Sequence, residues 1–163
     1  MHLVVVSGPS GSGKSTVGRR AAALADAAFF EGDDFHDAAA RRLIASGRGL
    51  TNDQRAPWLD RIGAAVRAAD APRGVLACSA LDDEVRARLT AAAGCATDFV
   101  LLAVPRAELA RRLAARTGHF AGPSLLDGQL AALDAAGLPR LDGTLPPDAL
   151  AAAVAARFSE QHG

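Results

Sequence analysis

The residues with the clearest chemical potential lie between Gly8 and Thr16, where the chain reads Gly-Pro-Ser-Gly-Ser-Gly-Lys-Ser-Thr. This segment fits the pattern G-x-x-x-x-G-K-[ST]. Its glycines let successive backbone N–H groups turn toward phosphate oxygens, and a helix that begins behind them adds the positive end of its dipole. The pattern predicts a phosphate-binding loop (P-loop) for ATP. The residues expected to contact the nucleotide are Gly8, Ser10, Gly11, Ser12, Gly13, Lys14, Ser15 and Thr16.

Lys14 is the only lysine among the 18 lysine and arginine residues of the chain. A compact ammonium on a flexible stem can follow the β- and γ-phosphates of a nucleotide, whereas a planar guanidinium is wider. We therefore predict that Lys14 is catalytic and that the Ser15 hydroxyl binds Mg²⁺. The alternative is a glycine-rich turn that holds no ligand.

Composition narrows the class of protein. The 163 residues suffice for one domain, residues 1–163, with a sizeable core. The formal net charge of zero and the absence of tyrosine argue against a nucleic-acid or membrane surface and favour a small-molecule partner. Cys78 and Cys95 are the only cysteines, which indicates neither a disulfide framework nor a structural metal. No leader-like segment or long apolar run is visible, so we expect a cytoplasmic protein.

Short apolar runs without alternation are typical of strands that helices cover on both faces. Such runs lie at residues 3–6, 28–30, 75–78 and 99–104, and a short last strand is expected near Leu141. Helical spacing separates them, and Pro57 suits a first helical turn before Leu59. The alternation predicts an α/β fold of three α/β/α layers, with a mainly parallel five-stranded sheet and helices on both faces.

Two segments interrupt this alternation. Residues from about 36 to 59 are too many for a plain connection and could form a substrate-binding insert. Residues from about 112 to 126 include Gly118, Gly122 and Pro123 and could form a mobile lid. An ordinary surface excursion is the alternative for each segment.

An acidic cluster follows the second predicted strand. Ligands in open parallel sheets bind beyond the carboxyl ends of the strands, so Asp33 is expected near the P-loop. We assign it to the acceptor hydroxyl, and also to Mg²⁺ through water. A solvated turn in which Asp34 or Asp37 caps the next helix is the alternative. His36 either contacts substrate or is structural, and Trp58 is expected to be a core anchor.

Because Lys14 is the only lysine, arginines must supply the remaining positive charge for binding a triphosphate. Arg112 and Arg116 are spaced i, i+4 on one predicted helix and could neutralise the transferring phosphoryl group as arginine fingers in cis. A surface pair between Arg112 and Glu108 is the alternative. Arg55 and Arg86 are candidates for binding an anionic acceptor.

Taken together, these motifs resemble the gluconate kinases of the shikimate-kinase-like P-loop group. The matching segments, in order, are GPSGSGKST, FFEGDDFH, ASGRGLTNDQRAPWL, CSAL, RLAARTGHF and LLDGQLAALD. The resemblance implies a P-loop kinase fold and transfer of phosphate from ATP to gluconate, giving 6-phosphogluconate, with Mg²⁺ as cofactor and often a homodimer. It also implies that His119, on the GHF motif, acts on the substrate with Arg112 or Arg116 when the lid closes.

The chain departs from the family pattern mainly on the acceptor side. Amides replace two usual aspartates, at Asn52 and Gln54, and Asp82 stands where the family has lysine. The altered positions are 40, 43, 52, 54, 82 and 85. They leave two alternatives open: a kinase of the same fold for shikimate or another sugar acid or alcohol, and a nucleotide-binding regulatory module with decayed catalysis.

Overall fold

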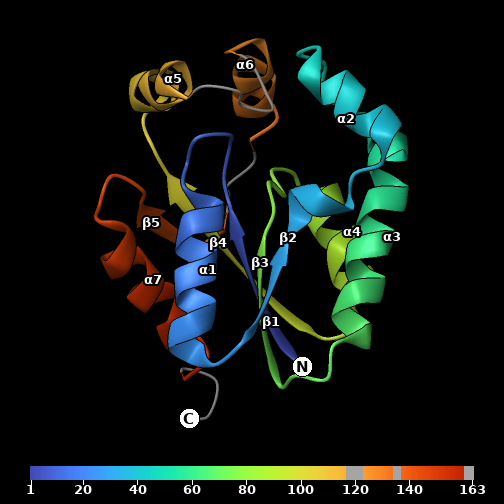
Figure 1. Ribbon diagram of the computed structural model, residues 1–163, viewed down its shortest axis with the longest axis vertical. Coiled ribbons are helices and arrows are strands. Elements are labelled where there is room, and N and C mark those ends of the chain that lie inside the picture. Colours follow the sequence, from blue (N-terminus) through green and yellow to red (C-terminus); the bar gives the residue numbers. More distant parts are fainter. Residues whose placement is uncertain (117–122, 134–136, 160–163) are drawn as a thin grey trace.

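The computed structural model describes residues 1–116, 123–133 and 137–159. Its five strands form one sheet in the order β2-β3-β1-β4-β5, and every pairing in it is parallel (Figure 1). The strands are β1 (His2–Ser7), β2 (Ala28–Glu31), β3 (Arg73–Ala77), β4 (Ala96–Ala103) and β5 (Arg140–Asp142). The predicted five-stranded sheet is therefore confirmed, and in the described residues it is parallel throughout.

Helices cover both faces of this sheet, as the sequence predicted. Helices α3 and α4 pack on one face, and α1 and α7 pack on the other, while α2, α5 and α6 lie beyond one end of the strands (Figure 1). The helices are α1 (Lys14–Ala25), α2 (Ala38–Ala45), α3 (Asn52–Ala68), α4 (Asp83–Ala93), α5 (Arg106–Ala115), α6 (Pro123–Ala131) and α7 (Pro147–Ala156), with a 3₁₀ turn η1 (Gly32–Phe35). None of the described helices combines the length and the apolar character needed to cross a membrane.

The central strand β1 shows why the apolar runs do not alternate. Leu3 and Val5 pack into the core with α3 and α4, whereas Val4 and Val6 pack into the core with α1 and α7. All four side chains are fully buried. Successive side chains of a strand point to opposite faces, so a strand between two helical layers must be apolar at every position.

Helix α3 begins earlier than the sequence suggested. It starts at Asn52 rather than behind Pro57, because Thr51 and Gln54 form a capping box. The Thr51 hydroxyl accepts from the Gln54 N–H at 3.2 Å, and the Gln54 side chain accepts from the Thr51 N–H at 3.0 Å. Gln54, one of the two unexpected amides, thus has a local role in starting the helix.

Replacing Gly63 by alanine should destabilise the fold. Gly63 lies in α3, where an added Cβ would overlap the backbone carbonyl of Ala92 at the end of α4. We expect a loss of about 1–3 kcal/mol in the free energy of unfolding, because overpacking outweighs the better helix propensity of alanine. Urea denaturation of the wild type and the variant measures this loss in the free energy of unfolding. The control is Gly128→Ala in α6, where the described residues leave open space; equal effects of both substitutions would contradict the close approach.

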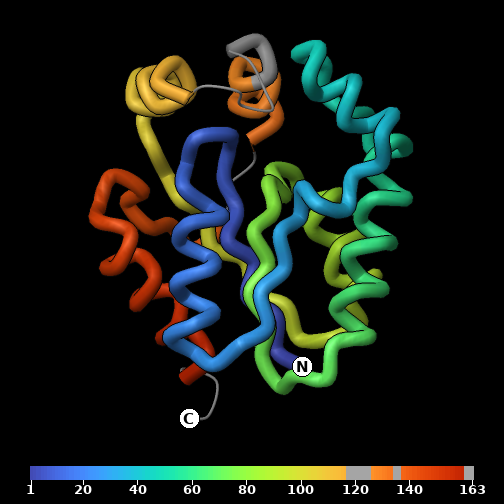
Figure 2. Tube along the Cα trace, in the orientation of Figure 1, coloured from blue at the N-terminus to red at the C-terminus, as the bar shows by residue number. Residues whose placement is uncertain are grey.

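The carboxyl ends of the strands bring the predicted motifs to one edge of the sheet. β1 leads into the loop at residues 8–13, β2 leads into η1, and β3 leads into residues 78–82 (Figure 2). In a parallel sheet these ends all point the same way, so segments far apart in the sequence meet there. This edge is where the candidate site lies.

Candidate active site

The P-loop has the backbone that its glycines predict. Gly8, Gly11 and Gly13 have φ angles of 150°, 84° and 96°, which L residues with a Cβ rarely adopt. Lys14 is the first residue of α1, and its Nζ donates to the carbonyl oxygen of Pro9 at 3.0 Å. The ammonium therefore lies back over the loop. Burial lowers its pKa below the ordinary value, and the nearby Asp33 carboxylate opposes that shift.

Glu31 is a functional candidate that the sequence interpretation passed over in favour of Asp33. It is the last residue of β2, and its carboxylate lies beside the side chain of Ser15. Burial raises the pKa of Glu31, the Ser15 side chain acts to lower it, and the neighbouring Asp33 and Asp34 raise it further. Its position at the carboxyl end of the strand was the signal that could have identified it.

The oxygen atoms of this corner suit Mg²⁺, which favours carboxylates, hydroxyls and phosphates. Ser15 and Glu31 are in contact, and Asp33 is close enough to affect the pKa values of both Glu31 and Lys14. Within the described residues, no three His, Cys, Asp or Glu side chains converge as a complete metal cage. The donor set therefore fits a metal that takes further ligands from a nucleotide.

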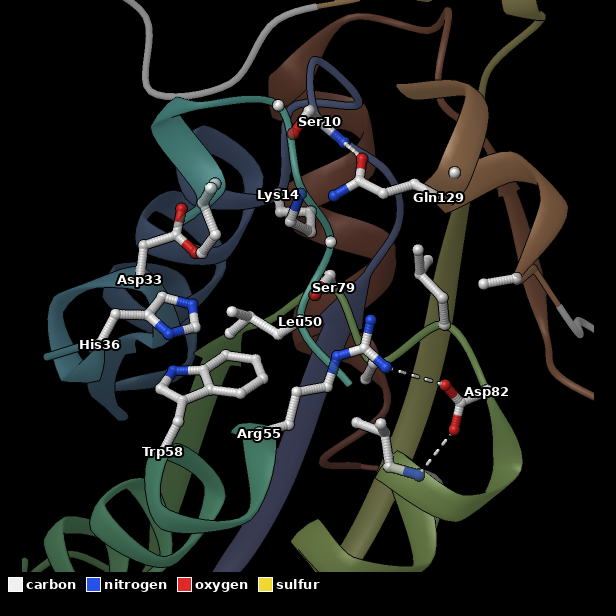
Figure 3. Close-up of a pocket in the computed structure, with 18 residues that line it drawn as sticks. Ser10, Lys14, Asp33, His36, Leu50, Arg55, Trp58, Ser79, Asp82 and Gln129 are labelled. Carbon is white, nitrogen blue, oxygen red and sulfur yellow. Dashed lines mark hydrogen bonds and ion pairs between the residues drawn. The ribbon is translucent and has the colours of Figure 1, made fainter. Parts of the chain in front are cut away.

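A cavity of about 180 Å³ opens beside Lys14 (Figure 3). It connects the P-loop with side chains from η1, α3, the β3–α4 connection and α6. The labelled polar and aromatic residues around it are Ser10, Lys14, Asp33, His36, Arg55, Trp58, Ser79, Asp82 and Gln129. Lys14, Asp33, His36 and Arg55, which the sequence predicted as site residues, are thus brought together around one space.

His36 and Trp58 form one wall of the cavity (Figure 3). Their rings are stacked, with centroids 4.3 Å apart and planes inclined by 15°. The Trp58 indole N–H donates to the carbonyl oxygen of Gly32 at 2.7 Å, and its ring belongs to the core beneath α3 and α4. The prediction that Trp58 is a core anchor is confirmed, and the same ring also supports His36.

Lowering the pH should destabilise the protein through His36. Burial lowers the pKa of the imidazole below its ordinary value of 6.5. As the pH falls through the unfolded-state value, the unfolded chain takes up a proton that the folded chain does not, so folding stability decreases. The thermal midpoint of the wild-type protein should therefore drop more between about pH 7.5 and about pH 5.5 than that of His36→Phe, which keeps an aromatic stack. Identical pH profiles would contradict this assignment.

Arg55 lies in the cavity within a set of polar contacts between α3 and α4. Its Nη1 donates to Asn52 Oδ1 at 2.7 Å and lies 3.6 Å from Asp82 Oδ2. The Asn52 amide nitrogen in turn donates to Glu84 Oε2 at 2.5 Å. Arg55 therefore lines the cavity with a carboxylate beside it, and its contact with an acceptor stays a prediction.

The structure does not support the predicted acceptor contact for Arg86. Arg86 lies in the first turn of α4, its side chain is only 6% exposed, and it is not among the described residues that line the cavity. It donates to the carbonyl oxygen of Ala80 at 3.1 Å and to Asp83 Oδ1 at 2.5 Å. Ala80 has a positive φ of 40°, so Arg86 braces a turn with an uncommon backbone conformation.

Arg112 and Arg116 do not share a helix face, because α5 ends at Ala115 and Arg116 is in an extended conformation. Arg112 contacts Glu108, as the alternative prediction had it, at 2.9 Å. It also donates to the carbonyl oxygens of Gly11 at 3.2 Å and Gly143 at 3.1 Å. Arg112 therefore links the P-loop to the residues after β5, whereas Arg116 is close enough to Lys14 to lower its pKa.

Gln129 contributes to the P-loop from α6, a contact that the sequence did not predict. Its Oε1 accepts from the backbone N–H of Ser10 at 2.8 Å (Figure 3). His119 lies outside the described residues, as do residues 117–122 of the predicted lid.

Comparison with known proteins agrees with this geometry. A family model described as an AAA domain matches residues 3–136. A gluconokinase of Gluconobacter oxydans is 37% identical over 155 residues, which cover 90% of this chain and 85% of that protein. The thermoresistant gluconokinase of Escherichia coli is 34% identical over 143 residues, which cover 86% of this chain and 81% of that protein. The chain belongs to the gluconokinase family.

Solved structures extend the similarity to the whole fold. A gluconokinase from Sinorhizobium meliloti has a TM-score of 0.82 and 39% identity, covering 98% of this chain and 94% of that one. A sugar kinase from Janibacter sp. HTCC2649 has a TM-score of 0.85 and 32% identity, covering 98% of this chain and 95% of that one. An APS kinase from Mycobacterium tuberculosis, at 24% identity and a TM-score of 0.68, shares the fold. The resemblance to gluconokinases and the P-loop kinase fold are both confirmed.

The altered positions of this gluconokinase-family chain have distinct places in the structure. Ala40 is buried in a small cluster with Ile44 and Leu50, and Leu43 packs against that cluster. Val85 is buried in the core beneath α3 and α4. Ala40 and Leu43 serve packing and Val85 also lines the cavity, whereas Asn52 and Asp82 contact Arg55 and so belong to the polar end of the cavity.

Proposed function

We propose that this gluconokinase-family protein transfers the γ-phosphoryl group of ATP to the 6-hydroxyl of gluconate, giving ADP and 6-phosphogluconate. The observation that carries the proposal is a single cavity that joins Lys14 and Asp33 to Arg55 (Figure 3). The similarity to gluconokinases over most of the chain supports the same acceptor.

In the proposed reaction, Asp33 accepts the proton of the acceptor hydroxyl as that oxygen bonds to the γ-phosphorus. The bond from the γ-phosphorus to the bridging oxygen of ADP breaks, and the electron pair leaves with ADP. Lys14 neutralises charge on the phosphate oxygens, and the loop amides that begin α1 donate hydrogen bonds to them. Arg116, which is close enough to Lys14 to affect its pKa, could neutralise the transferring group, and Arg112 could support the P-loop through its contact with Gly11.

Mg²⁺ is part of the proposal. Ser15, with Glu31 and Asp33 beside it, would hold the ion together with the nucleotide phosphates. The ion would supply neutralisation of the β- and γ-phosphate charge. The protein residues have the complementary task of orienting the acceptor hydroxyl toward Asp33.

The acceptor would lie along the His36–Trp58 wall with its carboxylate toward Arg55. We further propose residues 36–59 as the acceptor-binding insert of a single domain, because they supply His36, Leu50, Arg55 and Trp58 to the cavity. The lid at about 112–126, the substrate contact of His119, the cytoplasmic location and the homodimer remain predictions.

An acceptor-dependent assay tests the proposed function. Purified protein with Mg²⁺ and ATP should release ADP when gluconate is added, and mass spectrometry with ³¹P NMR should identify a primary phosphate ester. Shikimate, related sugar acids and water serve as comparison acceptors. If the protein binds ATP but transfers phosphate to none of these acceptors, the proposed kinase activity is contradicted. That outcome would favour a nucleotide-binding regulatory module.

A further inference from the structure

The acceptor end of the cavity contains a carboxylate directly beside its arginine. Among the described residues that line the cavity, the charged side chains other than histidine are Lys14, Asp33, Arg55 and Asp82. Lys14 lies near Asp33. Arg55 and Asp82 lie next to each other, away from Lys14 (Figure 3). Apart from Lys14, Arg55 is thus the only lysine or arginine among the described residues that line the cavity, and it already has a counter-ion.

The pair between Arg55 and Asp82 is sheltered from solvent. Each side chain is 27% exposed, so salt and water screen their charges less than those of a surface pair. Asn52 holds the same guanidinium at 2.7 Å and connects it to Glu84, which brings a second carboxylate to the group. An acceptor carboxylate that binds Arg55 must therefore approach Asp82 closely, and the two like charges repel.

We propose that Asp82 sets the charge preference for the acceptor: it weakens binding of an anionic sugar acid and admits an uncharged polyhydroxy acceptor. This inference rests on the proposed kinase function. Neighbouring hydroxyls can donate to the Asp82 carboxylate and accept from the Arg55 guanidinium, so a neutral polyol satisfies both partners. A carboxylate group can only accept, so an acceptor carboxylate bound at Arg55 cannot itself donate to Asp82.

Asp82 also has a structural role that the experiment must separate from its charge. Its Oδ1 accepts from the backbone N–H of Val85 at 2.9 Å and caps α4. Asparagine caps helices about as well as aspartate, so Asp82→Asn removes the charge and keeps the cap. A matched control is Asp60→Asn, since Asp60 pairs with Arg88 at 2.9 Å between the same two helices and is not part of the cavity lining.

Binding calorimetry with gluconate and with D-glucitol, an uncharged hexitol of the same chain length, tests the proposal. In Asp82→Asn we expect the affinity for gluconate to rise by about tenfold, because the repulsion between the Asp82 carboxylate and the gluconate carboxylate is gone. The affinity for glucitol should stay the same or fall. Asp60→Asn should match the wild type. An unchanged ratio of the two affinities in Asp82→Asn, or no measurable binding of either ligand to any variant, would overturn the inference.

The same proteins separate this inference from the proposed function. ADP release by the wild-type protein with gluconate tests the kinase, independently of Asp82. If ADP forms but the affinity ratio does not change in Asp82→Asn, the charge preference is wrong and the kinase stands. If the ratio changes but no phosphate is transferred, the kinase is wrong while the assignment of Asp82 to acceptor binding stands.

Discussion

Replacing Lys14 by alanine is expected to lower kcat by about 10³-fold or more, because it removes the only lysine and the ammonium that we propose neutralises the transferring phosphate. In the structure the Lys14 ammonium contacts the carbonyl oxygen of Pro9, and burial with the neighbouring Arg116 lowers its pKa. A charge held in a sheltered site acts more strongly on phosphate than one in open solvent. Steady-state ADP release with saturating acceptor measures the loss.

Two further Lys14 variants separate charge from packing. Lys14→Met keeps the stem and should lose as much activity as the alanine variant, with a thermal midpoint close to that of the wild type. Lys14→Arg keeps the charge but should also lose most activity, because a planar guanidinium is wider than the compact ammonium that contacts Pro9. Activity within tenfold of wild type in either variant would contradict the role of a compact ammonium at this position.

Replacing Asp33 by asparagine is expected to lower kcat by about 10²–10⁴-fold, the range typical of losing a general base. Asp33 lines the cavity beside Lys14, at the first turn after β2, where an acceptor hydroxyl can reach it. Asparagine preserves size and hydrogen bonding but cannot take up the proton. The KM for ATP should change far less than kcat, which initial-rate measurements over both substrates would show.

Asp34 offers a matched control for this substitution. It is the next residue of the same 3₁₀ turn, is exposed, and is not among the described residues of the cavity lining. Asp34→Asn should therefore keep activity within about threefold of wild type. Equal losses in Asp33→Asn and Asp34→Asn would mean that the turn needs its negative charge in general, and would remove Asp33 from the proposed chemistry.

The phosphate-binding part of the site was predictable because its information is local. Nine consecutive residues specify a loop whose glycines take conformations that other residues avoid. The strand-like run before the loop and the helix after it place the loop at a carboxyl end of the sheet without further assumptions. For the same reason, apolar runs at 3–6, 28–30, 75–78 and 99–104 predicted the central sheet.

Side-chain direction was not predictable, because it depends on elements that meet only in three dimensions. The sequence made Arg55 and Arg86 equal candidates for binding an anionic acceptor. In the structure Arg55 lines the cavity, whereas Arg86 is buried against Ala80 and Asp83. The i, i+4 spacing of Arg112 and Arg116 suggested one face of a helix, but α5 ends before Arg116. A spacing argument holds only while the helix continues.

The sequence by itself determined the parallel sheet, the phosphate loop with Lys14, and membership of a kinase family, because each is recognised from short segments whose pattern is local, taken in their order along the chain. Only the tertiary structure decided which charges share the acceptor end. The Arg55–Asp82 pair joins α3 to the cap of α4, and the Glu31 contact with Ser15 joins β2 to α1. Such pairs form because the strand ends converge at one edge of the sheet, a convergence that spacing along the chain does not show.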